Sequence, residues 1–329
     1  MRIPGPLSDH VDRIDLAIVA AAALPWLWFA VRDVWWVFEI VAIGMPLVVG
    51  VGLVWIAAVA AMSRRLAGTV PAASLLLFGV ATVVLPWAPD TTAVPVAPYR
   101  FITANVASPQ ADEDATAIAD GLVAQDPDVV VVPELSRAMH RELVGRFDTY
   151  AKTWPDDISG NLPFPAVGVY ADVPVELVEN TGDVLSGMRV RVGEGDRAVM
   201  LYALHLPKAS PSASGPSYTT TFGGHLGDVR RTLALIEAED LPVVVAGDLN
   251  SPDRSEAYRT LADQLHDAAR TSWAGPTSVK SSAVWRSLLL RIDHVMHTND
   301  LCSAGASRFE IPTSDHRGIG VDIGRCPTA

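Results

Sequence analysis

Cysteine and basic residues are both scarce in this chain of 329 residues. Its two cysteines, Cys302 and Cys326, form no C-x-x-C pair and do not lie beside histidines at zinc-finger spacing, which argues against a thiolate metal site. Lys and Arg number 25 against 37 Asp and Glu, so the formal net charge is -12. Affinity for nucleic acid comes mainly from Lys and Arg that neutralise phosphates. The composition therefore disfavours a dedicated nucleic-acid-binding protein.

Charged residues are rare in the first part of the chain, where apolar residues are concentrated. Residues 1–98 contain five Lys or Arg and six Asp or Glu, against 20 and 31 in the rest of the chain. Three apolar stretches lie there, at residues 16–31, 34–62 and 66–87. A helix needs about 20 apolar residues to cross a bilayer, so we expect three transmembrane helices. The first stretch is short and contains Pro25, and a cleaved signal peptide is the alternative for it.

The charges between these stretches predict how the segment is oriented. Arg64 and Arg65 mark their loop as cytoplasmic, since short cytoplasmic loops are rich in Lys and Arg. The amino terminus is then cytoplasmic, and everything after residue 87 lies on the outer side of a cell membrane. The positions of the tryptophans support this orientation, because indole rings prefer the membrane–water interface. Five of them fall near the expected outer ends of the transmembrane helices: Trp26, Trp28, Trp35, Trp36 and Trp87. Glu39 lies about one turn inside that interface, where its carboxyl can reach headgroups or water, so we assign it no function.

An outer location bears on the two cysteines. Disulfides persist in oxidising compartments, where Cys302 and Cys326 can pair. Their separation along the chain does not decide whether the geometry allows the bond, so the sequence leaves this question open.

The chain beyond the apolar stretches has the pattern of a linker followed by one domain. Residues 88–98, APDTTAVPVAP, are rich in proline and predict an extended spacer, and residues 99–329 form the second domain. Alternating or continuous apolar runs predict strands at 99–106, 129–132, 166–170, 173–179, 188–192, 198–204, 241–246, 288–297 and 318–323. Helices are predicted at 112–125, 136–147, 226–239 and 255–265. The pattern indicates an α/β (α+β) sandwich of two sheets covered by helices, with a mobile loop at 208–224.

Polar side chains stand where the apolar strands of this domain end. They are Asn105, Glu134, His205, Asp248, Asn250, Asp293, Asp315 and His316. Charged groups at such buried positions are costly unless they are paired, hydrogen-bonded or bound to a metal. We therefore treat them as one candidate site.

The oxygen donors of this set predict a hard-cation centre. Asparagine and carboxylate oxygens are ligands that Mg²⁺ selects, with Mn²⁺ as the alternative. The donors are Asn105, Glu134, Asp248, Asn250 and Asp315. His205 and His316 add acid–base capacity, and Asp293 is positioned to orient one of them. A metal, an oriented histidine and amide donors are what attack by water on a phosphorus ester requires.

The ordered motifs around these residues resemble a known family. They read T-A-N-V, V-P-E-L, L-H-L, G-D-L-N-S, R-I-D-H-V and S-D-H-R. Over residues 99–324 the sequence resembles the endonuclease/exonuclease/phosphatase superfamily, also called the deoxyribonuclease-I-like fold. The resemblance implies a four-layer α/β sandwich and Mg²⁺-dependent hydrolysis of phosphoesters.

The resemblance also implies a role for each metal-site residue. Glu134 resembles the main metal-binding glutamate, and Asn105 the asparagine beside it. Asn250 resembles the asparagine that holds metal or phosphate. Asp315 resembles the second acidic residue of the metal site.

The catalytic roles follow in the same way. Asp248 resembles the aspartate that orients or deprotonates the attacking water. His316 resembles the histidine at the scissile phosphate, and Asp293 the aspartate paired with it. His205 resembles the second active-site histidine of the nuclease and sphingomyelinase branches.

Two departures from the family pattern leave the substrate undefined. Many relatives carry a small residue, Ser and Arg in the central hairpin, where this chain reads Val-Tyr-Ala-Asp-Val-Pro at 169–174. The family's Thr-Trp-Pro is reduced to Pro-Thr-Ser at 276–278. Both segments shape substrate contacts in the family, while His225 and Lys208, which flank the loop, are further candidates to reach a phosphate.

We expect a membrane-tethered, outward-facing phosphodiesterase that acts on a lipid or lipid-linked phosphoester. The tether confines the site near lipid, and the acidic surface disfavours long nucleic acids. An extracellular nuclease of the same fold is the first alternative. A non-catalytic membrane-anchored binding module is the second, and an intact ligand set argues against it.

Overall fold

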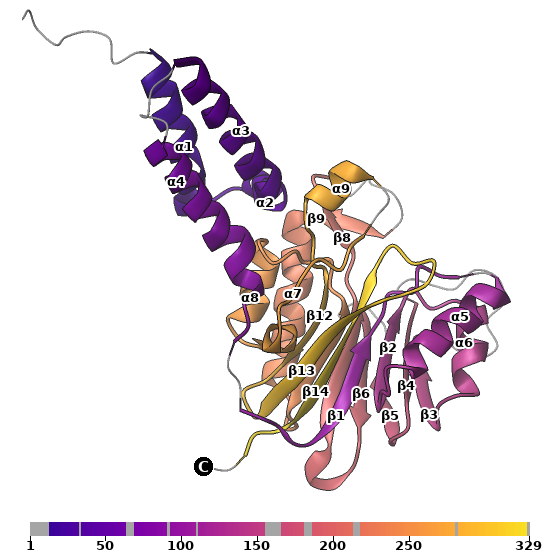
Figure 1. Ribbon diagram of the computed structural model, residues 1–329. Helices are drawn as coiled ribbons and strands as arrows, with labels where there is room; N and C mark the ends of the chain where they lie inside the picture. Colours follow the sequence, from indigo (N-terminus) through magenta and orange to yellow (C-terminus); the bar gives the residue numbers. More distant parts are fainter. Residues whose placement is uncertain are drawn as a thin grey trace, which may run out of the picture. The chain divides into compact units, whose positions relative to one another are not determined.

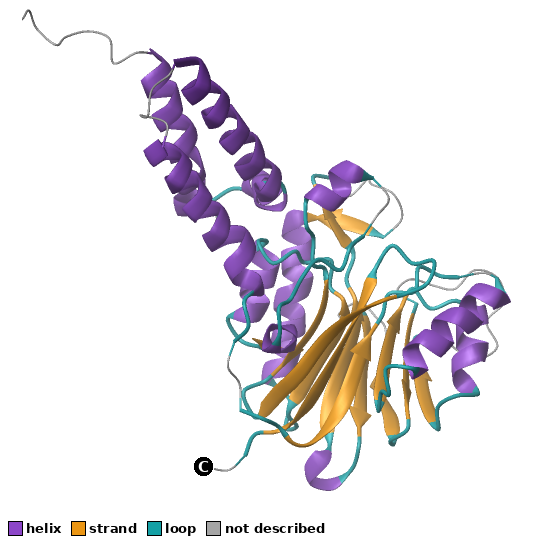
Figure 2. Cartoon of the chain, viewed as in Figure 1, coloured by secondary structure: helices purple, strands orange, loops and turns teal. Residues whose placement is uncertain are grey.

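The computed structural model describes residues 13–327, apart from residues 33, 64–68, 91–92, 110, 155–165, 181–185, 213–217 and 280–281. The chain divides into two compact units, Met1–Pro86 and Trp87–Ala329. Their elements are labelled in Figure 1 and coloured by type in Figure 2.

The first unit is helical, and its helices are shorter than the apolar stretches. It contains α1 (Arg13–Val31), α2 (Val37–Ile43), α3 (Met45–Ser63), α4 (Thr69–Gly79) and a π segment (Val80–Val84), and a 3-10 turn (Leu85–Trp87) includes its last two residues and the first residue of the second unit. The helix expected at 34–62 is broken at Gly44, where α2 and α3 meet at 70°. Pro46 explains the break, because proline cannot donate the backbone bond that would continue α2.

The expectation of three transmembrane helices is therefore not met as stated. Within the described residues, no single helix is both long and apolar enough to cross a membrane. The bent pair 37–43 and 45–58 passes this test only as a pair, by length and composition. The predicted cytoplasmic residues Arg64 and Arg65 lie outside the described residues.

The second unit is built on two six-stranded sheets. The first sheet has the order β13-β14-β1-β2-β4-β3, with β13 (Leu301–Glu310), β14 (Arg317–Arg325), β1 (Val96–Thr103), β2 (Val129–Pro133), β4 (Val167–Ala171) and β3 (Thr149–Lys152). The second has the order β11-β12-β10-β7-β6-β5, with β11 (His266–Asp267), β12 (Asp293–His297), β10 (Val243–Asp248), β7 (Val199–His205), β6 (Gly187–Val192) and β5 (Val175–Glu179). A small parallel pair, β8 (Lys208–Ser210) and β9 (Thr219–Thr221), lies inside the expected mobile loop.

Apolar faces stack these sheets into a four-layer sandwich, as expected. One core lies between the sheets and joins residues such as Phe101 and Val131 to Leu201 and Ala246. The outer face of the first sheet packs on α5 (Asp112–Val123) and α6 (Arg137–Val144), and that of the second on α7 (Phe222–Glu237) and α8 (Glu256–Ala262). Figure 1 shows the two helical layers on opposite sides of the sheets. Together these contacts confirm the predicted architecture of the domain.

The helix starts follow from local sequence. Ser136 and Ser255 accept hydrogen bonds from the backbone of Met139 and Tyr258, as N-cap residues do. Helix α7 begins at Phe222, four residues before the predicted start, because Thr221 caps it.

Five strands were not predicted, namely β3, β8, β9, β11 and β13, and β12 is shorter than predicted. Strand β13 is interrupted by a bulge between Ala304 and Ser307, where Gly305 has a positive φ of 62°. The small and polar residues of β13 do not show the alternation of apolar and polar residues that predicts a strand. Strand β12 begins at Asp293, five residues later than expected.

The described part of the expected spacer is paired with the domain. The backbone N–H of Ala274 donates to the carbonyl of Trp87, at 3.1 Å, and that of Asp90 donates to Arg270, at 2.6 Å. Strand β1 already begins at Val96. Close to Val96, which pairs with Arg325, Cys302 and Cys326 form a disulfide that joins β13 to the residue after β14.

Candidate active site

Three predicted residues form a row across the second sheet. In the β10–β7 pair Asp248 lies opposite His205, and in the β10–β12 pair it lies opposite Asp293. Gly247 allows this close pairing, because it has a φ of +147° and an added Cβ would lie 1.8 Å from the Leu204 carbonyl oxygen. The backbone register of three strands thus brings the three side chains to one edge.

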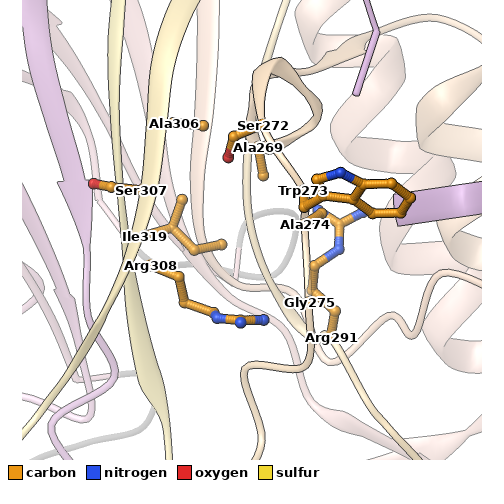
Figure 3. Close-up of a pocket in the computed structure, with 10 residues that line it drawn as sticks. All are labelled: Ala269, Ser272, Trp273, Ala274, Gly275, Arg291, Ala306, Ser307, Arg308 and Ile319. Atoms are coloured by element: carbon orange, nitrogen blue, oxygen red, sulfur yellow. The ribbon is translucent and has the colours of Figure 1, made fainter. Parts of the chain in front are cut away.

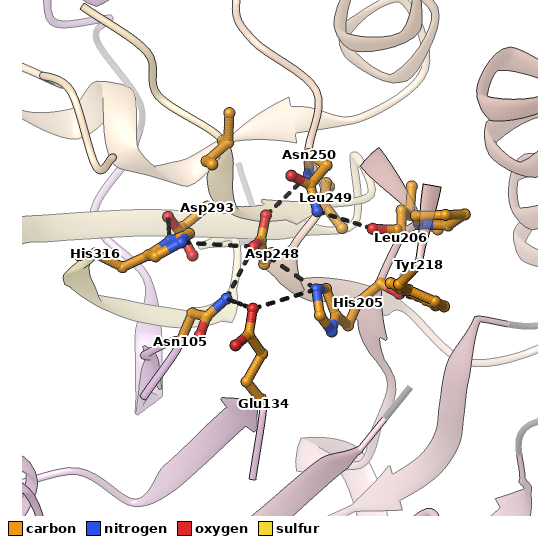
Figure 4. A network of polar contacts seen from close by, with 12 residues as sticks. Asn105, Glu134, His205, Leu206, Tyr218, Asp248, Leu249, Asn250, Asp293 and His316 are labelled. Atoms are coloured by element: carbon orange, nitrogen blue, oxygen red, sulfur yellow. Dashed lines mark hydrogen bonds and ion pairs between the residues drawn. The ribbon is translucent and has the colours of Figure 1, made fainter. Parts of the chain in front are cut away.

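The first sheet contributes two residues from the opposite side of the sandwich (Figure 4). Asn105 follows β1 and is fully buried; its Nδ2 donates to Glu134 Oε1 at 3.1 Å and to Asp248 Oδ2 at 2.9 Å. Glu134 follows β2 directly, with a left-handed backbone at a φ of 52°. This conformation is costly for a residue with a side chain and is typical of functional sites.

These side chains fit a hard divalent cation. Ligand atoms of Glu134, His205 and Asp248 all lie within 4.8 Å of one another. The two carboxylates are oxygen donors of the kind that suits Mg²⁺ or Mn²⁺, and the imidazole of His205 and the amides of Asn105 and Asn250 lie beside them. Asn105 presents its nitrogen to the carboxylates, while its Oδ1 accepts from the backbone of Ala107. As placed it holds two ligands together, and its own ligand role stays a prediction.

Asn250 is fixed beside Asp248 by its own backbone. Its N–H donates to Asp248 Oδ1 at 3.0 Å, and its Nδ2 donates to the Leu206 carbonyl at 2.9 Å. Its φ of 46° is again left-handed. The residue therefore links the loop after β10 to the loop after β7.

Asp293 and His316 form the predicted pair. His316 Nδ1 lies 2.9 Å from Asp293 Oδ2, and its Nε2 lies 3.9 Å from Asp248 Oδ2. Burial lowers the pKa of His316, but the charge and hydrogen bond of Asp293 outweigh it and raise the pKa to about 10. The imidazole is therefore protonated at neutral pH, with Nε2 directed toward the acidic group.

The other two buried groups have pKa values shifted in opposite directions. Burial, with the nearby charge of Asp293, raises the pKa of Asp248 to about 7, although His316 and Asn105 lower it. Burial lowers the pKa of His205 to about 3, so this histidine is neutral. A carboxylate that takes a proton near neutral pH and a neutral imidazole are groups that can accept a proton or bind a cation.

Asp315 lies at the edge of this arrangement. Its side chain is 42% exposed, and its Oδ1 is 3.8 Å from His316 Nε2. It belongs to none of the candidate metal groups found among the described residues. Its role as a second acidic ligand stays a prediction.

Two residues that support the site were not predicted. Thr277 is fully buried, and its Oγ1 accepts from the backbone N–H groups of Ile292 and Asp293 at 3.0 and 3.1 Å. Ser314 Oγ donates to the carbonyl of Asn105 at 2.8 Å and accepts from the N–H of His316. The reduced motif at 276–278 therefore contains a brace for the Asp293–His316 pair. Short hydroxyl residues in turns were the available signal.

The residues around the expected loop have structural roles. His225 is buried, with Nδ1 2.9 Å from the Pro207 carbonyl and Nε2 2.8 Å from Ser251 Oγ. Burial lowers its pKa to about 4. It joins two site loops, with both ring nitrogens within hydrogen-bond distance of protein oxygens rather than directed to solvent. The Tyr218 hydroxyl donates to the His205 carbonyl, which places the end of this segment against the site.

A separate small cavity lies behind the domain surface near Trp273, Gly275 and Arg308 (Figure 3). Its volume of about 20 Å³ is close to the minimum that a single water molecule needs. This cavity is therefore too small for a substrate.

Comparison with known proteins identifies a family and a fold. The profile described as Endonuclease/Exonuclease/phosphatase family matches residues 102–316. The structure is similar to an endonuclease/exonuclease/phosphatase from Bacteroides vulgatus, with a TM-score of 0.50, 15% identity, and coverage of 70% of this chain and 100% of the other. It is also similar to a beta toxin from Staphylococcus aureus, with a TM-score of 0.50, 11% identity, and coverage of 68% and 99%. At these identities the likeness shows the fold alone. No curated protein matches the sequence.

Proposed function

Because the chain belongs to the endonuclease/exonuclease/phosphatase family, we propose that it is a Mg²⁺-dependent phosphodiesterase whose substrate is a lipid or lipid-linked phosphoester. Members of this family are phosphoester hydrolases and depend on divalent metals. The observation that carries the proposal is the joint placement of Glu134, Asp248 and the Asp293–His316 pair at one edge of the sandwich.

The residues of the candidate site have different roles in the proposed hydrolysis. Glu134 and Asp248, with His205 beside them, would hold the cation, which when bound supplies a charge that stabilises phosphoryl oxygens. Asp248, whose Oδ2 lies 3.9 Å from Nε2 of His316, accepts the proton of the attacking water. His316, kept protonated by Asp293, donates Nε2–H to the charge that develops on the phosphate.

Three observations support an outward-facing, membrane-tethered enzyme. Long apolar stretches fill the first unit, where exposed side chains include Leu24, Val51 and Leu77. The Cys302–Cys326 disulfide fits an oxidising compartment. The excess of Asp and Glu fits a lipid-linked phosphoester better than a long nucleic acid.

Hydrolysis by the full-length protein in detergent tests the proposal. Phospholipids, sphingolipids, DNA and a phosphomonoester are compared with Mg²⁺, Mn²⁺ or EDTA. We expect metal-dependent turnover of a lipid phosphodiester that Glu134→Gln and His316→Ala abolish. Glu310→Gln is the matched control, because that carboxylate is 88% exposed.

The alternatives give different results in this assay. Preferred cleavage of DNA, with a rate that falls steeply as salt rises, would identify an extracellular nuclease. A folded protein that binds Mn²⁺ and hydrolyses no phosphoester would contradict the enzyme proposal and favour a binding module.

A further inference from the structure

Trp87, the first residue of the second unit, is joined to the domain through its side chain and its backbone. Its indole Nε1 donates to Asp253 Oδ2 at 2.6 Å, and its carbonyl accepts from the N–H of Ala274. The next residue, Ala88, accepts from Arg270 Nε at 3.3 Å. The side chain of Trp87 is half-buried. These contacts attach the start of the second unit to the segments that follow β10 and β11.

The partner of the indole belongs to a buried ion group. Arg291 donates to Asp253 Oδ1 and to both carboxylate oxygens of Asp267, and the three side chains are 1–3% exposed. The Tyr258 hydroxyl also donates to Asp267, at 2.6 Å. One guanidinium balances only one of the two carboxylates. The indole N–H donates to the Asp253 oxygen that does not accept from Arg291, which lowers the cost of burying that charge.

The ion group is not a second metal site. Ligand atoms of Asp253, Asp267 and His294 lie within 4.8 Å of one another, as a cation site would require. Arg291 already supplies the cation between the two carboxylates, and His294 Nε2 lies 2.8 Å from the Ser251 carbonyl.

The ion group adjoins the catalytic residues along two segments. Asp253 lies three residues after Asn250, and Arg291 lies two residues before Asp293. His294 Nε2 is 2.8 Å from the Ser251 carbonyl. The indole of Trp87 is therefore hydrogen-bonded to Asp253, at the end of the loop that carries Asp248 and Asn250.

We propose that Trp87 is a positioning residue for the catalytic loop at residues 248–253, acting through Asp253. The expected loss of kcat rests on the proposed function, whereas the expected loosening of the loop does not. The indole fixes the Asp253 carboxylate, and the carboxylate fixes the end of the loop. Without the N–H donor, the loop that presents Asp248 and Asn250 loses one of its anchors.

The test uses full-length Trp87→Phe, which keeps an apolar ring and removes the N–H. Trp273→Phe is the matched control, because its side chain is 61% exposed. Hydrogen exchange is measured on metal-free protein, where the amides of Leu249, Asn250 and Ser255 report on the loop through their hydrogen bonds. Mn²⁺ affinity is measured by electron paramagnetic resonance, and kcat and KM on bis(4-nitrophenyl) phosphate.

We expect faster exchange confined to residues 249–255 in Trp87→Phe. Mn²⁺ affinity and kcat should each fall about tenfold, as for other residues that orient metal ligands, while KM changes little. Trp273→Phe should match the unmodified protein in all measurements.

Two outcomes would overturn the proposal. One is exchange and Mn²⁺ affinity in Trp87→Phe within twofold of the unmodified protein. The other is faster exchange throughout the second unit with an unchanged kcat, which would show that the indole only stabilises the fold. If the unmodified protein binds Mn²⁺ but hydrolyses nothing, the proposed function fails, and exchange and Mn²⁺ affinity alone decide the role of Trp87.

Discussion

Two buried acidic groups lie side by side at the strand ends of β10 and β12, and they differ in what balances their charge. Asp253 and Asp267 have the permanent cation of Arg291 between them. Asp248 and Asp293 have His316, whose charge depends on a proton, and a space that suits an added cation.

The pKa values show what this difference does. Burial would raise the pKa of Asp267, but Arg291 outweighs burial and lowers it to about 2. The pKa of Asp248 is raised to about 7, because burial and Asp293 outweigh His316 and Asn105. The first group contains a permanent cation and supports the fold; the charge of the second is set by protons, and this group suits a metal and a reacting proton.

Asp248→Asn should have the largest effect and separate activity from stability. The amide keeps the shape of the side chain but cannot accept the water's proton, so we expect kcat to fall about 10³-fold to 10⁴-fold. The free energy of unfolding of the metal-free protein should not fall, because a buried charge is removed. Turnover assays and denaturant unfolding measure the two quantities. Unchanged kcat would contradict the assignment of Asp248.

Arg291→Met should instead act mainly on stability. Two buried carboxylates would lose their cation, which costs about 3 to 5 kcal/mol of unfolding free energy. Urea unfolding measures the loss. Arg141→Met is the matched control, since that ion pair with Asp112 is exposed and such pairs contribute about 1 kcal/mol or less. Equal effects of the two substitutions would remove the distinction between the groups.

The pH dependence of unfolding should distinguish the groups in metal-free protein. Because the pKa of Asp248 rises from 3.8 to about 7 on folding, its contribution is complete below 3.8 and is lost as pH rises through 7. For Asp267 the contribution is complete above 3.8 and is lost as pH falls toward 2.

Unfolding is therefore compared for the unmodified protein, Asp248→Asn and Asp267→Asn between about pH 5 and about pH 8. Asp248→Asn should gain relative stability as pH rises, whereas the effect of Asp267→Asn should not change with pH. Mg²⁺ should remove the Asp248 effect, because a bound cation favours the carboxylate. A flat profile for both variants would contradict the assigned pKa values.

Thr277→Val should have the smallest effect of the four. It keeps the size of the side chain and leaves two buried N–H groups without their acceptor, which costs about 1 to 3 kcal/mol. Because one of these groups belongs to Asp293, kcat should fall as well. Thr277→Ser retains the hydroxyl and should restore both. Loss of stability at constant kcat would show that Thr277 braces β12 without orienting Asp293.

The sequence predicts the strand-end chemistry well, because each candidate residue follows an apolar run. Asn105, Glu134, His205, Asp248 and Asp293 meet as the sandwich requires, and the helix starts predicted at Ser136 and Ser255 are confirmed. Asp315 and the metal itself stay predictions.

What the sequence misses depends on contacts between distant segments. The bulge in β13, the hydroxyl of Thr277 and the contact of Trp87 with Asp253 leave no periodic signal. The disulfide needed a geometry that sequence separation does not supply. In the first unit the position of Pro46 explains the broken helix, but a hydropathy count does not register it.

The pairing of β1 with β14 determines when the candidate site can assemble. Asn105 follows the first strand of the domain, whereas His316 immediately precedes β14, and these strands are neighbours in the sheet. Contacts of such long sequence separation are slow to form, because the chain between them must first be ordered. A folding intermediate without β14 would therefore hold Asn105, Glu134 and Asp248 but lack the Asp293–His316 pair, so the docking of this strand completes the site.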